Sequence, residues 1–147
     1  MHIMKFWILA VAALAHCATV LGQSPDQAWP FYGCNAGGER YAGLQQINDR
    51  NVSHLKLAWV YRTGELKTYE GTGASEKAAF EATPIMIGGI LYFSTPSDRV
   101  IAVGAMDGKE KWVFDPHVDL HGDFSEVSSR GVASWPAGKS PKRIFIG

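Results

Sequence analysis

Residues 85–114 hold four short β-rich runs at hairpin spacing, and this pattern constrains the fold more than any other part of the chain. The runs cover residues 85–87, 90–94, 100–103 and 110–114. Gly88-Gly89 stands between the first two, and Gly108 lies in the last turn. Short β-rich runs separated by glycine-containing turns are typical of antiparallel hairpins. The sequence therefore predicts a four-stranded antiparallel meander.

The flanks of this meander predict further strands and two loops. Alternating apolar residues over 55–62 predict a strand, and the polar, glycine-rich stretch 63–78 predicts a surface loop. Residues 115–130 have no periodicity and predict a functional loop, whereas 142–147 predict the start of another strand. One meander cannot bury both of its faces alone, so we expect the all-β fold of a β-propeller, with about one blade and its flanking segments present. We expect the sequence to stop inside the next blade, as a C-terminally truncated chain would.

The first residues have the features of a secretory signal. Lys5 precedes the apolar run 6–15, and small residues at 20–22 offer a cleavage site. We expect a signal peptide at residues 1–22, a mature segment at 23–147, and a periplasmic or secreted protein. The alternative is a retained membrane anchor and hence membrane association, although 6–21 is shorter than the roughly 20 apolar residues of a bilayer span.

Composition and motifs exclude several function classes. The formal net charge is 0, so the chain has no basic surface of the size that nucleic-acid binding needs. It also lacks a nucleophile motif and a phosphate loop followed by a helix. Acidic and histidine side chains gather at 115–123, but Pro116 and Gly122 oppose a helical metal site there, so we expect a solvated loop and no metal ligands.

Seven ordered segments resemble the pyrroloquinoline-quinone (PQQ)-dependent dehydrogenases. The segments include 29–33, 40–52, 57–59, 80–85, 91–102, 112–116 and 129–133. The resemblance implies an eight-bladed propeller that oxidises a sugar or alcohol and passes electrons to a respiratory quinone or cytochrome. It also implies PQQ and Ca²⁺ as cofactors. The calcium ligands and catalytic aspartate of the family lie in later blades, so no residue of this chain is predicted to be catalytic or to bind metal.

The same resemblance implies that Glu81 and Arg130 contact the cofactor, with Ser129 and Thr83 as secondary candidates. PQQ carries three carboxylates and an ortho-quinone, so it needs cations and hydrogen-bond donors around its rim. The planar, permanently charged guanidinium of Arg130 suits those oxygens. Arg130 ends the long loop and precedes Gly131, so we expect it to point into a cavity.

Two departures from the family pattern bear on the subclass and on the blade. Alcohol-oxidising relatives carry adjacent cysteines shortly before the arginine, whereas 124–129 has none, which favours the glucose-type branch. Gly104 and Asp107 stand where the family has Asp and Thr, so we expect a looser turn unless Asp107 bonds the turn itself. The alternatives are a PQQ-dependent alcohol dehydrogenase and a non-catalytic propeller that acts as a binding or assembly scaffold.

Overall fold

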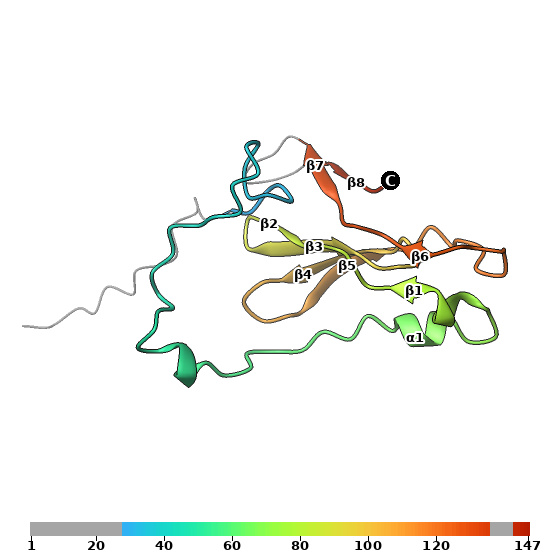
Figure 1. Cartoon of the computed structure of the whole chain (residues 1–147), viewed down its shortest axis with the longest axis horizontal. Helices are drawn as coiled ribbons and strands as arrows, with labels where there is room; N and C mark the ends of the chain where they lie inside the picture. The colour runs from blue at the N-terminus through green and yellow to red at the C-terminus, as the bar shows by residue number, and fades with distance from the viewer. Residues whose placement is uncertain (1–27, 136–142) are drawn as a thin grey trace, which may run out of the picture.

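A four-stranded antiparallel meander forms the centre of the structure, a computed structural model that describes residues 28–135 and 143–147. Its strands are β2 (Ile85–Ile87), β3 (Ile90–Ser94), β4 (Val100–Gly104) and β5 (Glu110–Phe114), and they neighbour one another in chain order (Figure 1). The predicted meander is confirmed. The predicted signal segment at 1–22 lies outside the described residues.

Strand β4 is the buried centre of this sheet. All five of its residues are buried, because β3 and β5 flank it and other segments cover both of its faces. Ala102 pairs with Tyr92 on one side and with Trp112 on the other, and the two rings lie 5.9 Å apart. The small alanine leaves room for the aromatic rings to approach across it, and such cross-strand pairs stabilise a sheet.

A second pair of strands packs against the meander near its β2 edge. Strand β8 (Arg143–Phe145) confirms the strand predicted at 142–147, and it pairs antiparallel with β7 (Ala133–Trp135), which the sequence pattern did not predict. Val132 and Ile144 pack against the buried cluster that contains Ile85 and Ile87. The hydrophobic core therefore extends from the meander toward this β7–β8 hairpin.

Residues 63–78 do not form the surface loop that their composition predicts. They contain the short helix α1 (Glu65–Thr68), the 3₁₀ turn η2 (Ala74–Glu76) and the start of β1 (Ala78–Ala79). Strand β1 pairs in parallel with β6 (Val127–Ser128), so the expected loop 115–130 also contains a strand. Tyr69, Ala74, Leu120 and Val127 form a separate small core between the two segments. None of the helices within the described residues is long and apolar enough to cross a membrane.

The carboxylate of Glu65 is buried at the start of α1 and is held by three side chains, one from the end of α1 and two from the turn between β3 and β4. Its side chain accepts hydrogen bonds from Tyr69 Oη (2.7 Å), Ser97 Oγ (3.1 Å) and Arg99 Nη1 (3.0 Å). Both members of the Glu65–Arg99 ion pair are largely shielded from solvent, with exposed side-chain fractions of 8% and 14%. Burial, together with this hydrogen bond, raises the pKa of the Tyr69 phenol. The network ties α1 to the turn between β3 and β4.

The prediction of a strand at 55–62 is wrong. Within the described chain this segment has no hydrogen-bonded neighbouring strand. Residues 52–54 form the 3₁₀ turn η1 (Val52–His54), and the chain then runs in extended form past the β4–β5 turn (Figure 1). Side chains hold it there: Trp59 Nε1 donates to Ala105 O at 3.1 Å, and Tyr61 Oη donates to the Glu110 carboxylate. Leu57, which alternation places on the same face as Trp59 and Tyr61, is 80% exposed.

Asp107 bonds the β4–β5 turn, as the sequence predicted it could. Its Oδ1 accepts the Lys109 N–H at 3.1 Å, and this hydrogen bond holds the pKa of the Asp107 carboxyl below its usual range. The same oxygen occupies the space that a Cβ on Gly104 would take. Gly104 and Asp107 are therefore complementary, and a side chain at 104 is incompatible with the present position of the carboxylate.

We expect Gly104→Ala to destabilise the protein by about 1–3 kcal/mol, because the new methyl group displaces the Asp107 carboxylate from the turn. Chemical denaturation of the intact protein measures the cost. In an Asp107→Ala background the same alanine should cost much less. An equal cost in both backgrounds would show that the two positions do not compete for space.

Candidate functional site

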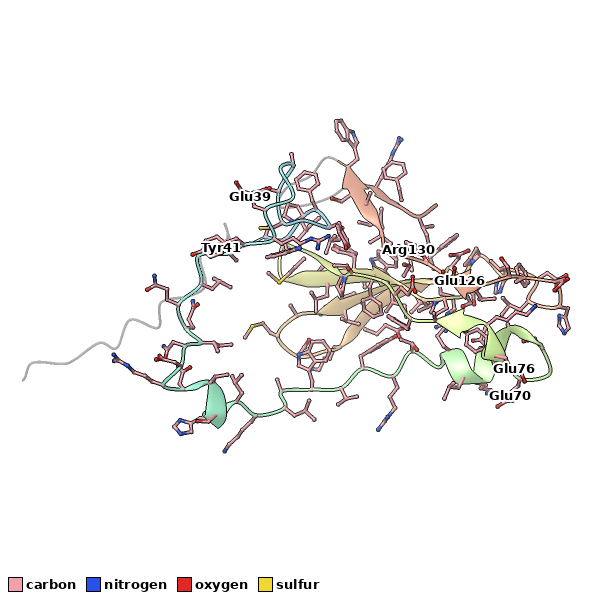
Figure 2. The ribbon with its side chains drawn as sticks, viewed as in Figure 1. Glu39, Tyr41, Glu70, Glu76, Glu126 and Arg130 are labelled. Atoms are coloured by element: carbon pink, nitrogen blue, oxygen red, sulfur yellow. The ribbon has the colours of Figure 1, made fainter. Side chains whose placement is uncertain are left out.

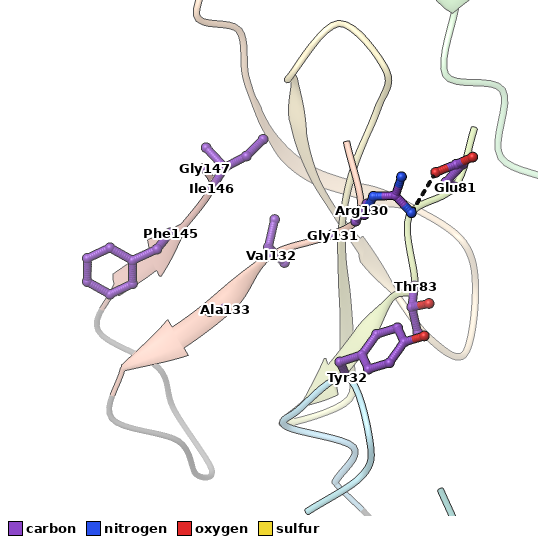
Figure 3. A pocket seen from close by; sticks show the side chains of 10 residues that line it. All are labelled: Tyr32, Glu81, Thr83, Arg130, Gly131, Val132, Ala133, Phe145, Ile146 and Gly147. Atoms are coloured by element: carbon purple, nitrogen blue, oxygen red, sulfur yellow. Dashed lines mark ion pairs between the residues drawn. The ribbon is translucent and has the colours of Figure 1, made fainter. Parts of the chain in front are cut away.

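A cavity of about 650 Å³ lies between the β7–β8 hairpin, the segment before β2 and the N-terminal loop. Three of the four predicted site residues line it: Glu81, Thr83 and Arg130 (Figure 3). The opposite wall is apolar and includes Val132 and Phe145. The structure thus brings the predicted residues together in one concave place.

The backbone sets Glu81 and Arg130 side by side. Thr83 N donates to Arg130 O at 3.3 Å, and Thr83 and Gly131 form an isolated parallel bridge. Gly131 has φ = 135°, and a Cβ there would lie 3.0 Å from Thr83 O. Only glycine fits this backbone conformation and this close approach. The glycine after Arg130 is therefore required for the bridge that positions the arginine.

Arg130 and Glu81 form an ion pair at the cavity, with Nη1 and Oε2 3.1 Å apart. The Arg130 side chain is 78% exposed, and the Glu81 side chain 38%. An exposed pair of this kind contributes little to stability. The guanidinium has five N–H donors, so it can bind a carboxylate or quinone oxygen while Glu81 holds one of its nitrogens.

Ser129 lies apart from the cavity lining. It is buried, and its hydroxyl donates to Ser94 Oγ at 2.8 Å. Side chains alternate in direction along β6 and the residues after it, which explains this burial. Val127 and Ser129 are buried, whereas Glu126 and Arg130, both labelled in Figure 2, are exposed. The hydroxyl of Ser129 therefore bonds within the protein interior, and its role toward a cofactor stays a prediction.

Tyr32 is a cavity residue that the sequence reasoning did not select. It lines the same cavity as Thr83 and Arg130, and it comes from the N-terminal loop far from both in sequence. Its only sequence signal was an aromatic residue in a glycine-rich loop, which more often packs onto a protein body than binds a ligand. The fold, and not the local pattern, brings it to the site.

The acidic and histidine side chains of 115–121 bond to their own loop. Asp115 Oδ1 accepts the His117 N–H at 2.8 Å, and Asp119 Oδ1 accepts the His121 N–H at 3.0 Å. This bond is the main cause that lowers the pKa of Asp119. In the described ranges, no three His, Cys, Asp or Glu side chains are placed to hold a metal ion.

Comparison with known proteins identifies the family that the chain matches. Residues 29–147 match the family described as "PQQ: Glucose/ethanol/alcohol dehydrogenase, beta-propeller domain". The chain is 42% identical over 123 residues to the quinoprotein glucose dehydrogenase of Escherichia coli, and 41% identical over 112 residues to quinoprotein glucose dehydrogenase A of Acinetobacter calcoaceticus. These alignments cover 84% and 76% of this chain.

A solved structure agrees on the fold. The quinohemoprotein alcohol dehydrogenase of Comamonas testosteroni superposes with a TM-score of 0.64 and 31% sequence identity over 84% of this chain. The match covers 17% of that structure, and the two glucose dehydrogenases are covered over 15% and 14% of their length. The chain thus corresponds to a small part of each of these longer proteins.

Proposed function

Because the chain belongs to the PQQ-dependent glucose, ethanol and alcohol dehydrogenase family and forms part of its β-propeller, we propose that the protein containing it oxidises a sugar or polyol hydroxyl. The proposal includes a periplasmic location, reached by the signal predicted at 1–22, and a respiratory quinone or cytochrome as electron acceptor. The whole reaction is a proposal for the longer protein, since this chain spans only a small part of its relatives.

Two observations support a sugar over a simple alcohol. Two relatives described as glucose dehydrogenases reach 42% and 41% identity, whereas a third, from Gluconobacter oxydans, and a quinohemoprotein alcohol dehydrogenase of Comamonas testosteroni both reach 36%. The stretch 124–129 also lacks the adjacent cysteines that the resemblance associates with alcohol oxidation. An alcohol dehydrogenase is therefore the second outcome that a substrate assay must separate.

The observation that carries the proposal is the Glu81–Arg130 pair at the cavity. The donor set fits the cofactor: a largely exposed guanidinium and the Thr83 hydroxyl are the groups that an anionic, carboxylate-bearing quinone needs. When bound, PQQ accepts the two electrons that leave the substrate CH–OH group. Arg130 holds a cofactor oxygen, Glu81 fixes the guanidinium plane, and Gly131 keeps the backbone that positions both.

Ca²⁺ belongs to the proposal through the family resemblance alone. We expect its ligands and the catalytic base in the part of the protein that lies outside this chain. Glu81 and Arg130 therefore act in cofactor binding and orientation, and no proton transfer is assigned to them.

Reconstitution of the intact protein tests the proposed function. Purified protein is loaded with PQQ and Ca²⁺ and assayed with glucose, other polyols and primary alcohols, with an artificial dye as electron acceptor. We expect cofactor absorbance to survive desalting and sugars to be oxidised faster than alcohols. Absence of both retained absorbance and activity would rule out a dehydrogenase and favour the scaffold alternative. Faster oxidation of alcohols would reassign the substrate class.

We expect Arg130→Ala to weaken PQQ binding by roughly ten- to a hundredfold, because a hydrogen bond to a charged group is worth about 1.5–3 kcal/mol. Glu81→Gln should weaken it less, since the amide can still accept a hydrogen bond from Arg130. Titration with PQQ, followed by quenching of tryptophan fluorescence, measures the affinity. Arg50→Ala removes an exposed arginine elsewhere and serves as the control. Equal affinities for the Arg130 and Arg50 variants would refute the role of Arg130.

A further inference from the structure

The N-terminal loop holds Tyr32 at the cavity by several independent contacts. Trp29 pairs with Met86 of β2 through two backbone hydrogen bonds of 2.8 Å, which fixes the loop to the strand that follows Thr83. Trp29 Nε1 also donates to Tyr32 O at 3.4 Å. The position of Tyr32 relative to Thr83 is therefore set by the sheet.

The loop then folds back and brings a second cation to Tyr32. A Cβ on the buried Gly33 would lie 2.5 Å from Gly38 Cα, so glycine permits the two backbones to cross closely. Arg40 N donates to Gly33 O at 2.9 Å, and Arg40 has φ = 51°, which is uncommon for a side-chain-bearing residue. This conformation places Arg40 Cζ 4.7 Å from the centre of the Tyr32 ring.

This stacked pair is exposed instead of buried in a core. Tyr32 is 57% exposed and lines the cavity, and Figure 3 shows its hydroxyl pointing toward Thr83. A cation over an aromatic face is attracted by the ring quadrupole and fixes the ring orientation. It also adds positive potential to the cavity wall next to Thr83.

We propose that Tyr32 is a further cofactor-binding residue of this cavity, whose hydroxyl donates a hydrogen bond to an anionic oxygen of the bound quinone and whose ring is positioned by Arg40. The inference rests on the proposed function and deepens it. It adds a phenol donor to the guanidinium of Arg130, so an elongated ligand with oxygens at both ends is held at two places. A planar, carboxylate-bearing ring system is the ligand class that this arrangement suits.

Matched variants of the intact protein test the role of Tyr32. Tyr32→Phe removes only the hydroxyl and keeps the ring under Arg40, and we expect it to weaken PQQ affinity on the order of tenfold. Arg40→Gln should weaken it about two- to fivefold through loss of the cation over the ring. Tyr41→Phe removes the hydroxyl of a tyrosine of the same loop that is 74% exposed and does not line the cavity, and should leave the affinity unchanged. Fluorescence titration with PQQ measures all of them, without recourse to activity.

The outcomes separate this inference from the proposed function. If Tyr32→Phe binds PQQ as tightly as the unaltered protein while Arg130→Ala has lost affinity, the role of Tyr32 is refuted and the proposed function stands. A higher KM for sugar with unchanged PQQ affinity also refutes it, because Tyr32 would then contact substrate. If the unaltered protein itself binds no PQQ, the proposed function is refuted, and the role of Tyr32 that rests on it is refuted as well.

Discussion

Glu65→Ala should lower the free energy of unfolding by about 3–5 kcal/mol, because it leaves the guanidinium of Arg99 buried without its carboxylate. Arg99 would keep a hydrogen bond to Thr63 O at 2.9 Å, but Asp115 lies 3.8 Å from its Nε and only weakly replaces Glu65. Ser97 and Tyr69 would also lose their shared acceptor. Chemical denaturation of the intact protein measures the loss.

Neighbouring acidic residues and the partner arginine provide the controls. Glu70→Ala changes an exposed glutamate just after α1, at its outer side in Figure 2, and should cost less than about 0.5 kcal/mol. Replacing both partners, as Glu65→Leu with Arg99→Met, should cost far less than the Glu65 change alone, since no unpaired charge then stays buried. Additive costs of the two single changes would mean that the ion pair is not coupled.

Gly108→Val should destabilise the protein by about 2–6 kcal/mol through backbone strain and overpacking. Gly108 has φ = 64°, a region that a β-branched residue avoids. A Cβ at this position would lie 2.5 Å from Cδ2 of the Trp59 indole, which packs directly against the glycine. The valine therefore separates the extended segment 55–62 from the β4–β5 turn. Denaturation followed by tryptophan fluorescence reports both the stability and the altered surroundings of the indole.

Two variants divide this cost into its causes. Gly89→Val meets a similar φ of 75° but has nothing within 4 Å of its Cβ, so it should show the strain alone. In a Trp59→Ala background, Gly108→Val should lose its overpacking component and cost about as much as Gly89→Val. If Gly108→Val costs no more than Gly89→Val in the unaltered background, Trp59 does not pack tightly on the turn.

Sequence periodicity predicted the parts of the fold that depend on neighbouring residues. The four strands of the meander and strand β8 followed from short apolar runs and glycine turns, and each is present. The secondary-structure predictions failed where tertiary contacts override the local sequence pattern. Residues 63–78 are polar and rich in glycine, yet Glu65 is buried there because Arg99, which is distant in sequence, neutralises it. Alternation at 55–62 likewise predicted a strand that has no partner in the described chain.

Those residues of the candidate site that lie in family motifs could be predicted from the sequence. Resemblance identified Glu81, Thr83 and Arg130, and all three line one cavity. It could not show that the Ser129 hydroxyl turns inward to Ser94, because one step along an extended chain reverses the direction of a side chain. Tyr32 was not predicted, because its position at the cavity depends on the pairing of Trp29 with Met86.

The order β2-β3-β4-β5 has a consequence for how this molecule folds. Every pairing in the meander joins strands adjacent in sequence, so each costs little loop-closure entropy and can form early. The bridge between Thr83 and Gly131, in contrast, closes a loop that contains the entire meander. We therefore expect the cavity to be assembled after the blade between its two halves has formed, so changes that slow folding of the blade should delay the acquisition of cofactor affinity during refolding.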